Sequence, residues 1–270
     1  MRIKGRAGRQ SVSALVEVSD IHHSYRSQDD DGKWIPVLHG VSFSVRAGEC
    51  LGIIGESGSG KSTLGRILLG LEAPKSGQVR LAGQPLYAPS RFCRPRRKRA
   101  ARVSAVFQDY TSSANPFMNV SSIVSEPLLV QGMTRRDDVR RQVIALLEQV
   151  GLTDDVYERF PHQLSGGQMQ RVCIARAIAG KPDFMVLDEA VSALDVTVQV
   201  QILDLLADLR QQLGLTYLFI SHDLTAITYL CQRVIFLQQG SIIERVDDMA
   251  ALGQVRHPYA RNLLQAVMAF

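Results

Sequence analysis

The sequence lacks any long run of apolar residues. No stretch approaches the roughly 18 residues that suggest a membrane-spanning helix, so any link to a membrane is expected to come through a partner. The basic start, MRIKGRAGRQ, has no apolar segment after it, which argues against a secretory signal. These absences predict a chain that stays in the cytosol.

Cysteine is scarce, and the sequence shows neither an internal repeat nor a low-complexity segment. His22 and His23 are adjacent but have no third or fourth ligand nearby in sequence, so no metal site is predicted there. The cysteines have no short pairing interval, which predicts isolated reduced thiols. They are Cys50, Cys93, Cys173 and Cys231.

Charge is modest but unevenly placed. The net charge is +5, and seven basic residues crowd between Arg91 and Arg102. Such a cluster suits either a patch for nucleic acid or anionic lipid, or a solvated surface element ahead of a buried strand. Only Phe92 interleaves with the basic residues, which favours the solvated surface and predicts no nucleic-acid partner.

Short apolar runs rich in β-branched residues alternate with helical patterns, which indicates an α/β fold. With 270 residues, of which 46% are hydrophobic, the chain has material for one large domain or two small ones. A hairpin over 233–246 is expected to turn at Gln239-Gly240. The other expected strands cover 14–18, 41–45, 50–55, 78–83, with a turn at 83–85, and 103–108, 184–189 and 216–221.

The strand pattern stops between residues 110 and 180. Apolar residues from Val139 to Val150 follow the helical period, Gly151 ends that helix, and a further helix is expected over 167–180. We therefore expect a single domain from 1 to 270. It would contain an α/β core (14–109 and 181–246), a helical insertion (110–180) and a tail (247–270) whose helix runs over 259–268.

The run GESGSGKST matches the phosphate-binding pattern G-x-x-x-x-G-K-[ST]. It follows an apolar strand and opens the helical run LGRILLGL, which is the setting that the pattern requires. Backbone amides would face the β-phosphate, Lys61 would reach the β- and γ-phosphate oxygens, and Ser62 would bind Mg²⁺. The residues expected to bind nucleotide are Gly55, Glu56, Ser57, Gly58, Ser59, Gly60, Lys61, Ser62 and Thr63.

Polar residues end three of the expected central strands. Gln108 and the pair Asp188–Glu189 end two of these strands, and His222 directly follows the third. In open parallel sheets the ligand lies beyond the carboxyl ends of the strands. All of them should therefore lie beside the phosphate loop. Asp188 would hold Mg²⁺, directly or through water, and Glu189 would activate the attacking water as a general base.

The run LSGGQ contains a glycine pair that opens a helix. Backbone amides at a helix N-terminus attract anions, so this run is a second phosphate cradle. One chain rarely needs two such cradles unless the second serves another molecule, which predicts a protein that works in pairs. Its residues are Leu164, Ser165, Gly166, Gly167 and Gln168.

With these motifs in this order, the chain resembles the nucleotide-binding subunits of ATP-binding-cassette (ABC) transporters from about residue 15 to 264. The resemblance implies a P-loop NTPase domain with a mixed central sheet, an N-terminal antiparallel β subdomain and a helical insertion subdomain. It also implies ATP hydrolysis with Mg²⁺, in which Lys61, Glu189 and His222 are catalytic. The family's dimer is head-to-tail, so Ser165 and Gly167 would close over the γ-phosphate that Lys61 of the other subunit holds.

The same resemblance assigns further positions. Gln108 would contact Mg²⁺ and couple the site to membrane subunits, and Tyr25 would stack on adenine, with Trp34 as a rival aromatic. Ser192 and Asp195, the ends of SALD, would belong to the loop that crosses the dimer interface.

Several stretches resemble the ATPases of peptide and nickel importers, among them SALDVTVQVQILDLL, SHDL and HPYARNLLQAV. GLEAP, QRVCIARA and DEAVS are closer to the nickel branch, although Ala190 replaces the usual proline and ANPFMNV departs from the usual LNPR. The chain ends at Phe270 without the cysteine cluster that many such ATPases carry, so no iron–sulfur centre is expected.

Nickel or nickel-chelate import implies several partners: a sister ATPase, two membrane permease subunits and an extracytoplasmic solute-binding protein. The chain would then lie peripherally at the cytoplasmic face of the inner membrane. A dipeptide or oligopeptide importer is the alternative. A soluble cassette ATPase acting on ribosomes or DNA is a rival of a different class. Such ATPases resemble either two cassettes in one chain or a cassette split by a long coiled coil, and this sequence has neither. A catalytically silent regulatory cassette is disfavoured by the presence of Lys61, Glu189 and His222.

Overall fold

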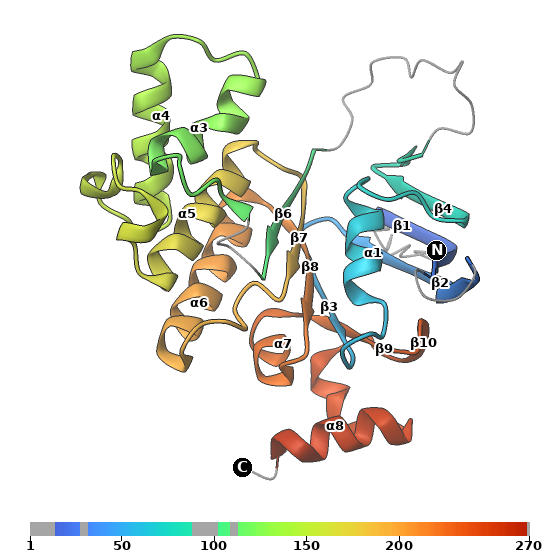
Figure 1. Cartoon of the computed structure of the whole chain (residues 1–270). Helices are drawn as coiled ribbons and strands as arrows, with labels where there is room; N and C mark the ends of the chain where they lie inside the picture. Colours follow the sequence, from blue (N-terminus) through green and yellow to red (C-terminus); the bar gives the residue numbers. More distant parts are fainter. Residues whose placement is uncertain (1–13, 28–31, 88–101, 109–112, 269–270) are drawn as a thin grey trace, which may run out of the picture.

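The computed structural model describes residues 14–27, 32–87, 102–108 and 113–268, with side chains described as far as residue 265. Cys93 and most of the basic cluster lie outside these residues; Arg102 is the member that lies within them. Two β-sheets and a group of helices make up the described part of the chain (Figure 1).

The first sheet is antiparallel, with strand order β2-β1-β4-β5. Its strands are β1 (Ala14–Arg26), β2 (Trp34–Arg46), β4 (Ser76–Leu81) and β5 (Gln84–Pro85). The prediction ended the first strand at residue 18 and began the second at 41, and both limits were wrong. The turn expected at 83–85 after the fourth strand is present, but it lies at 82–83, and residues 84–85 form β5. β1 and β2 pair along their length with several register shifts, which interrupt the alternation of polar and apolar residues that would have revealed them.

The second sheet is mixed, as predicted, with strand order β10-β9-β3-β8-β7-β6. Strands β6, β7, β8, β3 and β9 are parallel neighbours, and β10 pairs antiparallel with β9. The strands are β3 (Cys50–Ile54), β6 (Val103–Phe107), β7 (Phe184–Asp188), β8 (Thr216–Ser221), β9 (Arg233–Gln238) and β10 (Ser241–Val246). The carboxyl ends of β3, β6, β7 and β8 therefore lie at one edge, where the polar residues were expected.

The helices are α1 (Lys61–Leu68), α3 (Val120–Val130), α4 (Arg136–Gln149), α5 (Gly166–Ala179), α6 (Val196–Leu213), α7 (Leu224–Leu230) and α8 (Pro258–Met268). Short 3₁₀ helices cover Asp154–Val156, Pro161–Gln163 and Met249–Gln254. The described residues from 113 to 180 contain helices and no strand. The sequence reasoning did not assign α3, α6 or α7. Pro127 obscures α3, which forms because it buries Ile123, Val124 and Leu128 against the neighbouring helices.

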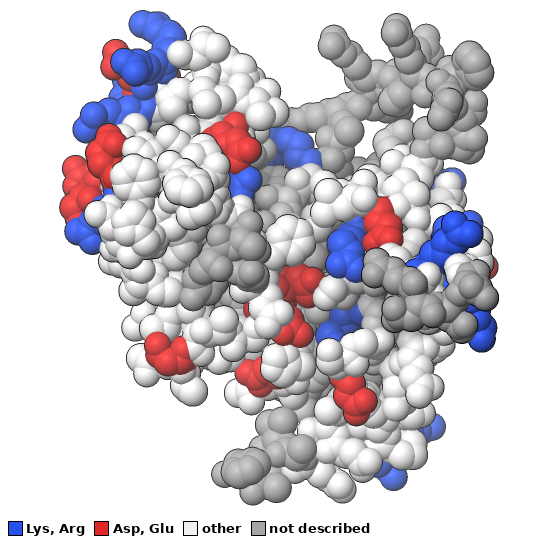
Figure 2. Space-filling model, viewed as in Figure 1, with Lys and Arg blue, Asp and Glu red and all other residues white. Residues whose placement is uncertain are grey.

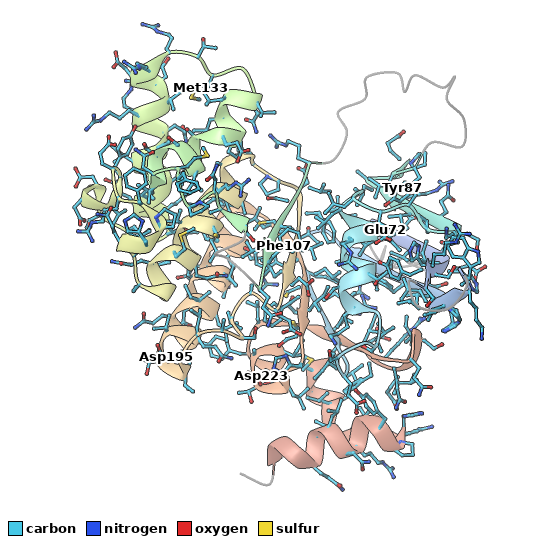
Figure 3. The ribbon with its side chains drawn as sticks, viewed as in Figure 1. Glu72, Tyr87, Phe107, Met133, Asp195 and Asp223 are labelled. Carbon is cyan, nitrogen blue, oxygen red and sulfur yellow. The ribbon has the colours of Figure 1, made fainter. Side chains whose placement is uncertain are left out.

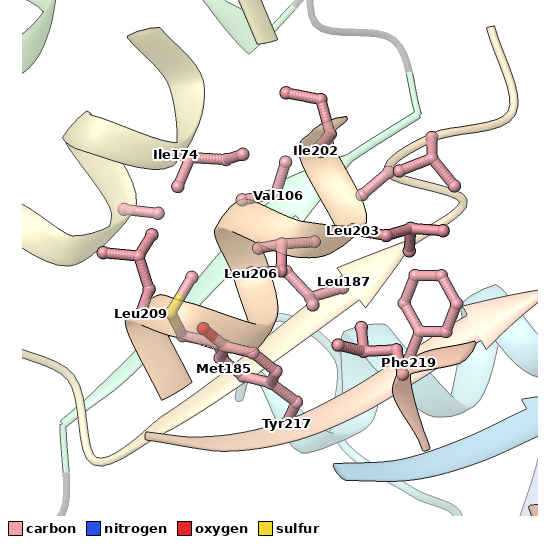
Figure 4. Packing of buried hydrophobic residues seen from close by; sticks show 14 of the residues in the cluster. Val106, Ile174, Met185, Leu187, Ile202, Leu203, Leu206, Leu209, Tyr217 and Phe219 are labelled. Carbon is pink, nitrogen blue, oxygen red and sulfur yellow. The ribbon is translucent and has the colours of Figure 1, made fainter. Parts of the chain in front are cut away.

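The mixed sheet is buried on both faces. Phe184 and Val186 of β7 face the cluster that contains α1 and the antiparallel sheet, whereas Met185 and Leu187 face the cluster that contains α5 and α6. In Figure 4, leucines and an isoleucine of α6 pack over β7 and β8. This two-sided burial fixes the strand ends, and with them the residues that follow each strand.

Two cysteines predicted to be isolated are in contact. The Sγ atoms of Cys50, at the start of β3, and Cys231, at the end of α7, lie 3.4 Å apart in the core. The interval of 181 residues hid this pair, because parallel strand topology rather than sequence spacing brings the two together. Both are free thiols.

Candidate nucleotide-binding site

The phosphate loop connects β3 to α1, as predicted. Its path needs glycine at two positions in particular. A Cβ atom on Gly55 would lie 2.2 Å from the Leu237 carbonyl oxygen, and Gly60 combines a φ of +100° with a Cβ position 2.8 Å from Leu38. The backbone of the loop is thus held between the sheet and the antiparallel β-strands, with α1 starting directly after it.

Lys61 is buried beneath the loop. Its ammonium donates to the carbonyl oxygens of Gly55 and Glu56, each at 2.7 Å, and lies 3.4 Å from Ser59 Oγ. Burial lowers the pKa of Lys61, and the nearby carboxylates of Glu189 and Asp188 oppose that effect. The structure therefore brings together the lysine and both strand-end acids that the sequence predicted.

Asp188 is the last residue of β7 and faces the start of α1. The Ser62 hydroxyl donates to Asp188 Oδ1 at 3.3 Å. Burial raises the pKa of Asp188, while the bond from Ser62 lowers it. Gln108 follows Phe107, whose Cα is paired with that of Asp188, so it lies at the same edge. Among the described residues, however, its side chain forms no bond with Ser62 or Asp188.

Glu189 has a left-handed backbone, with a φ of +49°. Non-glycine residues rarely adopt this conformation, which costs on the order of 1 kcal/mol. Bonds hold it in place: its N–H donates to the Ile220 carbonyl at 2.9 Å, and its own carbonyl accepts from Ser192 Oγ at 3.0 Å. The Glu189 carboxylate lies 3.3 Å from His222 Nδ1. No signal in the sequence predicted this backbone geometry.

Tyr25 lies over the first turns of α1. Its hydroxyl donates to Glu72 Oε2 at 2.7 Å, accepts from Arg66 Nη2 at 3.0 Å, and is 3.3 Å from Thr63 Oγ1. His23 Nε2 is 3.0 Å from the other oxygen of Glu72. Figure 3 labels Glu72 beside α1, near Tyr87. Glu72 therefore contacts Tyr25, His23 and Arg66, and no local pattern in the sequence marks it for this role.

Trp34, the rival aromatic, is placed differently. It is 53% exposed, and the Lys75 ammonium lies 3.9 Å from the centre of its ring. Of the two aromatics, Tyr25 is therefore the one whose ring is fixed beside the phosphate loop.

Glu72 carries the charge of this network. Burial alone would raise its pKa, but Tyr25, His23 and Arg66 outweigh burial and lower it. The side chain therefore stays ionised, and it holds Tyr25 through a charge-assisted hydrogen bond.

The LSGGQ run lies at the start of α5, away from the phosphate loop of its own chain. Ser165 caps the helix: its Oγ accepts from Gln168 N at 3.2 Å, and Gln168 Oε1 accepts from Ser165 N at 3.0 Å. A Cβ atom on Gly167 would lie 2.6 Å from Val198 Cγ1 of α6, so packing also demands glycine here. Ser165 is exposed, Leu164 is partly buried against the core, and Gly166 begins the helix.

Gln170 connects this helix to the acidic edge, and no motif in the sequence marks it for this role. The side chain is 1% exposed, and its Nε2 donates to the Ala190 carbonyl at 2.6 Å. Ala190 is the residue after Glu189, in the position where a proline was expected. The start of α5 is thus bonded to the backbone that carries the strained glutamate.

The loop after Glu189 continues into α6. Asp195 caps that helix by accepting from Val198 N at 3.0 Å. Asp223, which follows His222, caps α7 and accepts from Gln199 Nε2 of α6 at 2.8 Å. Asp195 and Asp223 are labelled at the starts of these two helices in Figure 3. Ser192 and Asp195 therefore lie on one loop that leaves the acidic edge.

A phosphate loop beside two strand-end carboxylates defines a phosphate-loop nucleoside triphosphatase. The family model described as ABC transporter matches residues 38–192. The chain belongs to this family of ATP-hydrolysing cassettes, binds ATP, and has the cassette fold expected from its sequence.

Three curated relatives show how far the similarity extends. The metal-staphylopine import system ATP-binding protein CntF of Staphylococcus aureus is 41% identical over 257 residues, which cover 95% of this chain and 100% of CntF. A putative peptide import ATP-binding protein of Brucella ovis is 44% identical, covering 94% of this chain and 78% of its own length. A similarly described protein of Brucella abortus is 47% identical, covering 84% and 68%.

Solved structures support the same fold. The dimeric ATP-binding cassette MJ0796 has a TM-score of 0.73 and 27% sequence identity, covering 86% of this chain and 97% of that chain. A dimer of MJ0796 bound to ADP and Pi, in a post-hydrolysis state, matches equally well. Within the described residues, no helix is both long and apolar enough to cross a membrane.

Proposed function

We propose that the chain is the ATPase subunit of a membrane importer that takes up nickel or a nickel chelate. The observation that carries the proposal is the convergence of Lys61, Asp188, Glu189 and His222 at one edge of the sheet. The LSGGQ run lies elsewhere, at the start of α5, where Ser165 is exposed. The first group suits hydrolysis, and the second suits a partner's nucleotide.

The proposed roles follow from the contacts. The nine loop residues from 55 to 63 hold the phosphates, and oxygens of the β- and γ-phosphates replace loop carbonyls as partners of the Lys61 ammonium. Glu189 accepts a proton from the attacking water, and His222, beside it at 3.3 Å, contacts the γ-phosphate. Tyr25 stacks on adenine, because its hydroxyl bonds hold its ring beside Thr63.

Mg²⁺ fits the oxygen donors of this edge. Ser62 Oγ and Asp188 Oδ1 are 3.3 Å apart, and the carboxylate has a raised pKa because it is buried without a full countercharge. A hard cation that binds one or two carboxylates together with phosphates suits this pair, and Gln108 lies at the same edge. Bound there, Mg²⁺ would neutralise charge on the phosphates.

Two cassettes are proposed to pair head-to-tail, a sister ATPase chain being the partner. Ser165 and Gly167 would then present helix-end amides to the γ-phosphate held by Lys61 of the other chain. Ser192 and Asp195 would cross between the subunits, on the loop that leaves Glu189. The dimeric MJ0796 cassette supports this arrangement.

The helical insertion (110–180) is proposed to receive the membrane subunits, with residues 14–109 and 181–246 forming the catalytic core and 247–270 a tail. A groove of about 480 Å³ lies between β6 and the helices α3 and α5, and is lined partly by Leu71, Phe107, Pro127 and Arg176. Phe117 and Val130 are 88% and 85% exposed on the same helical part. By contrast, charges of both signs gather over α4 (Figure 2), which suits a solvated face.

Such an importer needs two permease subunits and an extracytoplasmic solute-binding protein, and it places this chain at the cytoplasmic face of the inner membrane. The described function of CntF, metal-staphylopine import, supports a metal chelate as cargo. The two Brucella relatives, at 44% and 47%, support the alternative of peptide import. Similarity to the nickel-import ATP-binding protein NikE in GLEAP, QRVCIARA and DEAVS favours nickel.

Uptake in a deletion strain tests the cargo. Cells lacking this chain are supplied with radioactive nickel or a labelled dipeptide, and the wild-type gene is returned as control. Loss of nickel uptake with normal dipeptide uptake is expected. Unchanged nickel uptake would overturn the nickel assignment, and loss of dipeptide uptake instead would establish the peptide importer.

A soluble cassette acting on ribosomes or DNA is a different class of function. Capture of the tagged chain from detergent-solubilised membranes decides between the two. Permease subunits should accompany it, whereas ribosomal or DNA-bound partners without any membrane protein would favour the soluble class.

A further inference from the structure

The C-terminal segment reaches the phosphate loop through one tyrosine. The hydroxyl of Tyr259, in the first turn of α8, accepts a hydrogen bond from the backbone N–H of Glu56 at 2.8 Å. The two residues are 203 positions apart. Figure 1 shows α8 running beneath α7, on the side of the molecule where the loop between β3 and α1 lies.

Glu56 is hydrogen-bonded through both of its backbone polar groups. Its N–H donates to Tyr259, and its carbonyl accepts from the Lys61 ammonium at 2.7 Å. A second contact from the C-terminal part supports the same loop, because Gly240 N in the β9–β10 turn donates to the Ser59 carbonyl at 3.0 Å. Two residues from the C-terminal part of the chain, Gly240 and Tyr259, therefore form hydrogen bonds with the backbone of the phosphate loop.

The position of Tyr259 is itself fixed by the fold. Glu244 of β10 accepts from the backbone N–H groups of Arg256 and His257, at 3.0 and 2.6 Å, just before α8 begins. Ala260 is fully buried and Leu264 nearly so. These bonds and this burial fix the turn and α8 against the rest of the protein. The Tyr259 hydroxyl therefore has a defined position beside the phosphate loop.

We propose that Tyr259 is a positioning residue for nucleotide binding, which holds the outer end of the phosphate loop in its phosphate-binding conformation. A loop whose backbone is already ordered loses less conformational entropy when it binds phosphate. The bond acts on the backbone of the loop that is proposed to hold the phosphates, so it should support ATP and ADP alike. The inference rests on the proposed nucleotide role of residues 55–63.

Replacing Tyr259 with Phe keeps the ring and removes only the acceptor. In the full 270-residue chain, we expect the dissociation constants of both ATP and ADP to rise about fivefold, which corresponds to about 1 kcal/mol. Isothermal titration measures both. The turnover rate at saturating ATP should stay within about twofold, because the variant leaves the reacting groups unchanged.

Hydrogen exchange gives a readout that a loss of stability alone would not give. Peptides that contain Glu56 should exchange faster in Tyr259→Phe, while the melting temperature and exchange in the core strands stay as in wild type. Tyr229→Phe is the matched control, since it removes the hydroxyl bond to Asp204 from the neighbouring helix α7. It should alter neither affinity nor loop exchange.

Glu244→Ala is a second variant, which loosens the turn before α8 without touching the loop. It should weaken both nucleotides in the same direction. Unchanged affinity and loop exchange in Tyr259→Phe, or equal effects in Tyr229→Phe, would overturn the proposal. Neither measurement involves transport, so a negative result here is distinct from a failure of the importer assignment. If the wild-type chain bound ATP without protection of residues 55–60, the proposed role of the loop itself would fail.

Discussion

His222 Nδ1 lies 3.3 Å from Glu189 Oε1, and this contact joins the ends of β8 and β7. The glutamate is held there by a left-handed backbone, and its peptide N–H is bonded to Ile220, two residues before the histidine. Neither side chain has a competing ion-pair partner among the described residues.

His222→Gln tests the role of this pair. Gln retains hydrogen-bonding capacity but cannot take the charge of an imidazolium, so the rate of phosphate release at saturating ATP should fall about 10²-fold. ATP affinity should change little, because Lys61 and the loop amides are untouched. His22→Gln, an exposed substitution on β1, is the control. Retention of the wild-type turnover rate in His222→Gln would remove the histidine from the mechanism.

Asp188→Asn tests the cost of the buried carboxylate. Burial raises the pKa of Asp188, so its charged form is disfavoured in the folded protein and destabilises it at neutral pH. Without Mg²⁺, the Asn variant should therefore have a free energy of unfolding about 1 kcal/mol higher at pH 7, or a melting temperature higher by about 2–4 °C. The difference should start to shrink as the pH falls through the raised pKa, where folded wild-type Asp188 becomes neutral. It should be absent below the ordinary aspartate pKa of the unfolded chain.

The same variant should lose the extra thermal stabilisation that Mg²⁺ adds to ATP. Thermal scans in chelator, and in ATP with and without Mg²⁺, measure both effects. Asp208→Asn, an exposed change on α6, should show neither. A lower melting temperature of Asp188→Asn in chelator would contradict the claim that the buried charge of Asp188 destabilises the wild-type protein.

Gln170→Met tests the connection between α5 and the acidic edge. Methionine fills a similar volume but leaves the buried Ala190 carbonyl without its donor, so the free energy of unfolding should fall by about 1–3 kcal/mol. The rate of phosphate release should fall as well, because the backbone next to Glu189 loses a support. Urea unfolding and phosphate release measure the two effects.

Gln131→Met is the control, since Gln131 Nε2 donates to the Gly180 carbonyl at 2.9 Å on the exposed surface. It should change the free energy of unfolding by less than about 0.5 kcal/mol and leave turnover intact. Equal loss of turnover in both variants would mean that Gln170 has no special link to the site.

Tyr25→Ala tests the choice between the two aromatics. Loss of a stacked ring should weaken ATP binding by about 1–3 kcal/mol, while Trp34→Ala should leave it unchanged because Trp34 is turned to Lys75 and solvent. Glu72→Gln should weaken ATP binding less, and should have no further effect in the Tyr25→Ala background if Glu72 acts through Tyr25. Titration of ATP into each variant measures these changes. If the effects of Glu72→Gln and Tyr25→Ala on ATP affinity were additive in the double variant, Glu72 would act independently of Tyr25.

The parts of the site that the sequence predicted depend on local patterns. The phosphate loop, the acids after β7 and the histidine after β8 each follow a short apolar strand, so their place at one sheet edge could be inferred. The hairpin at Gln239-Gly240 was also correct, with both residues at positive φ. Both inferences needed only a strand, a turn residue and the rule for parallel sheets.

The parts that the sequence missed depend on long-range contacts. Gln170, Glu72 and Tyr259 act on residues that are 20, 47 and 203 positions away, and nothing local distinguishes them from other polar side chains. The strain at Glu189 is likewise set by Ile220 and Ser192, which hold its backbone in a conformation that its own type disfavours. Packing, rather than pattern, determines these features.

The central claim is that ATP hydrolysis by this chain powers nickel uptake. Uptake by a strain that carries Glu189→Gln tests this claim most directly. The Gln side chain preserves shape but cannot accept the proton of water, so ATP should still bind while hydrolysis falls by about 10²–10⁴-fold. Glu17→Gln, an exposed change on β1, is the control. The account predicts that labelled nickel uptake is lost in Glu189→Gln and normal in Glu17→Gln. Wild-type uptake by a Glu189→Gln chain that binds ATP and hydrolyses none would contradict it.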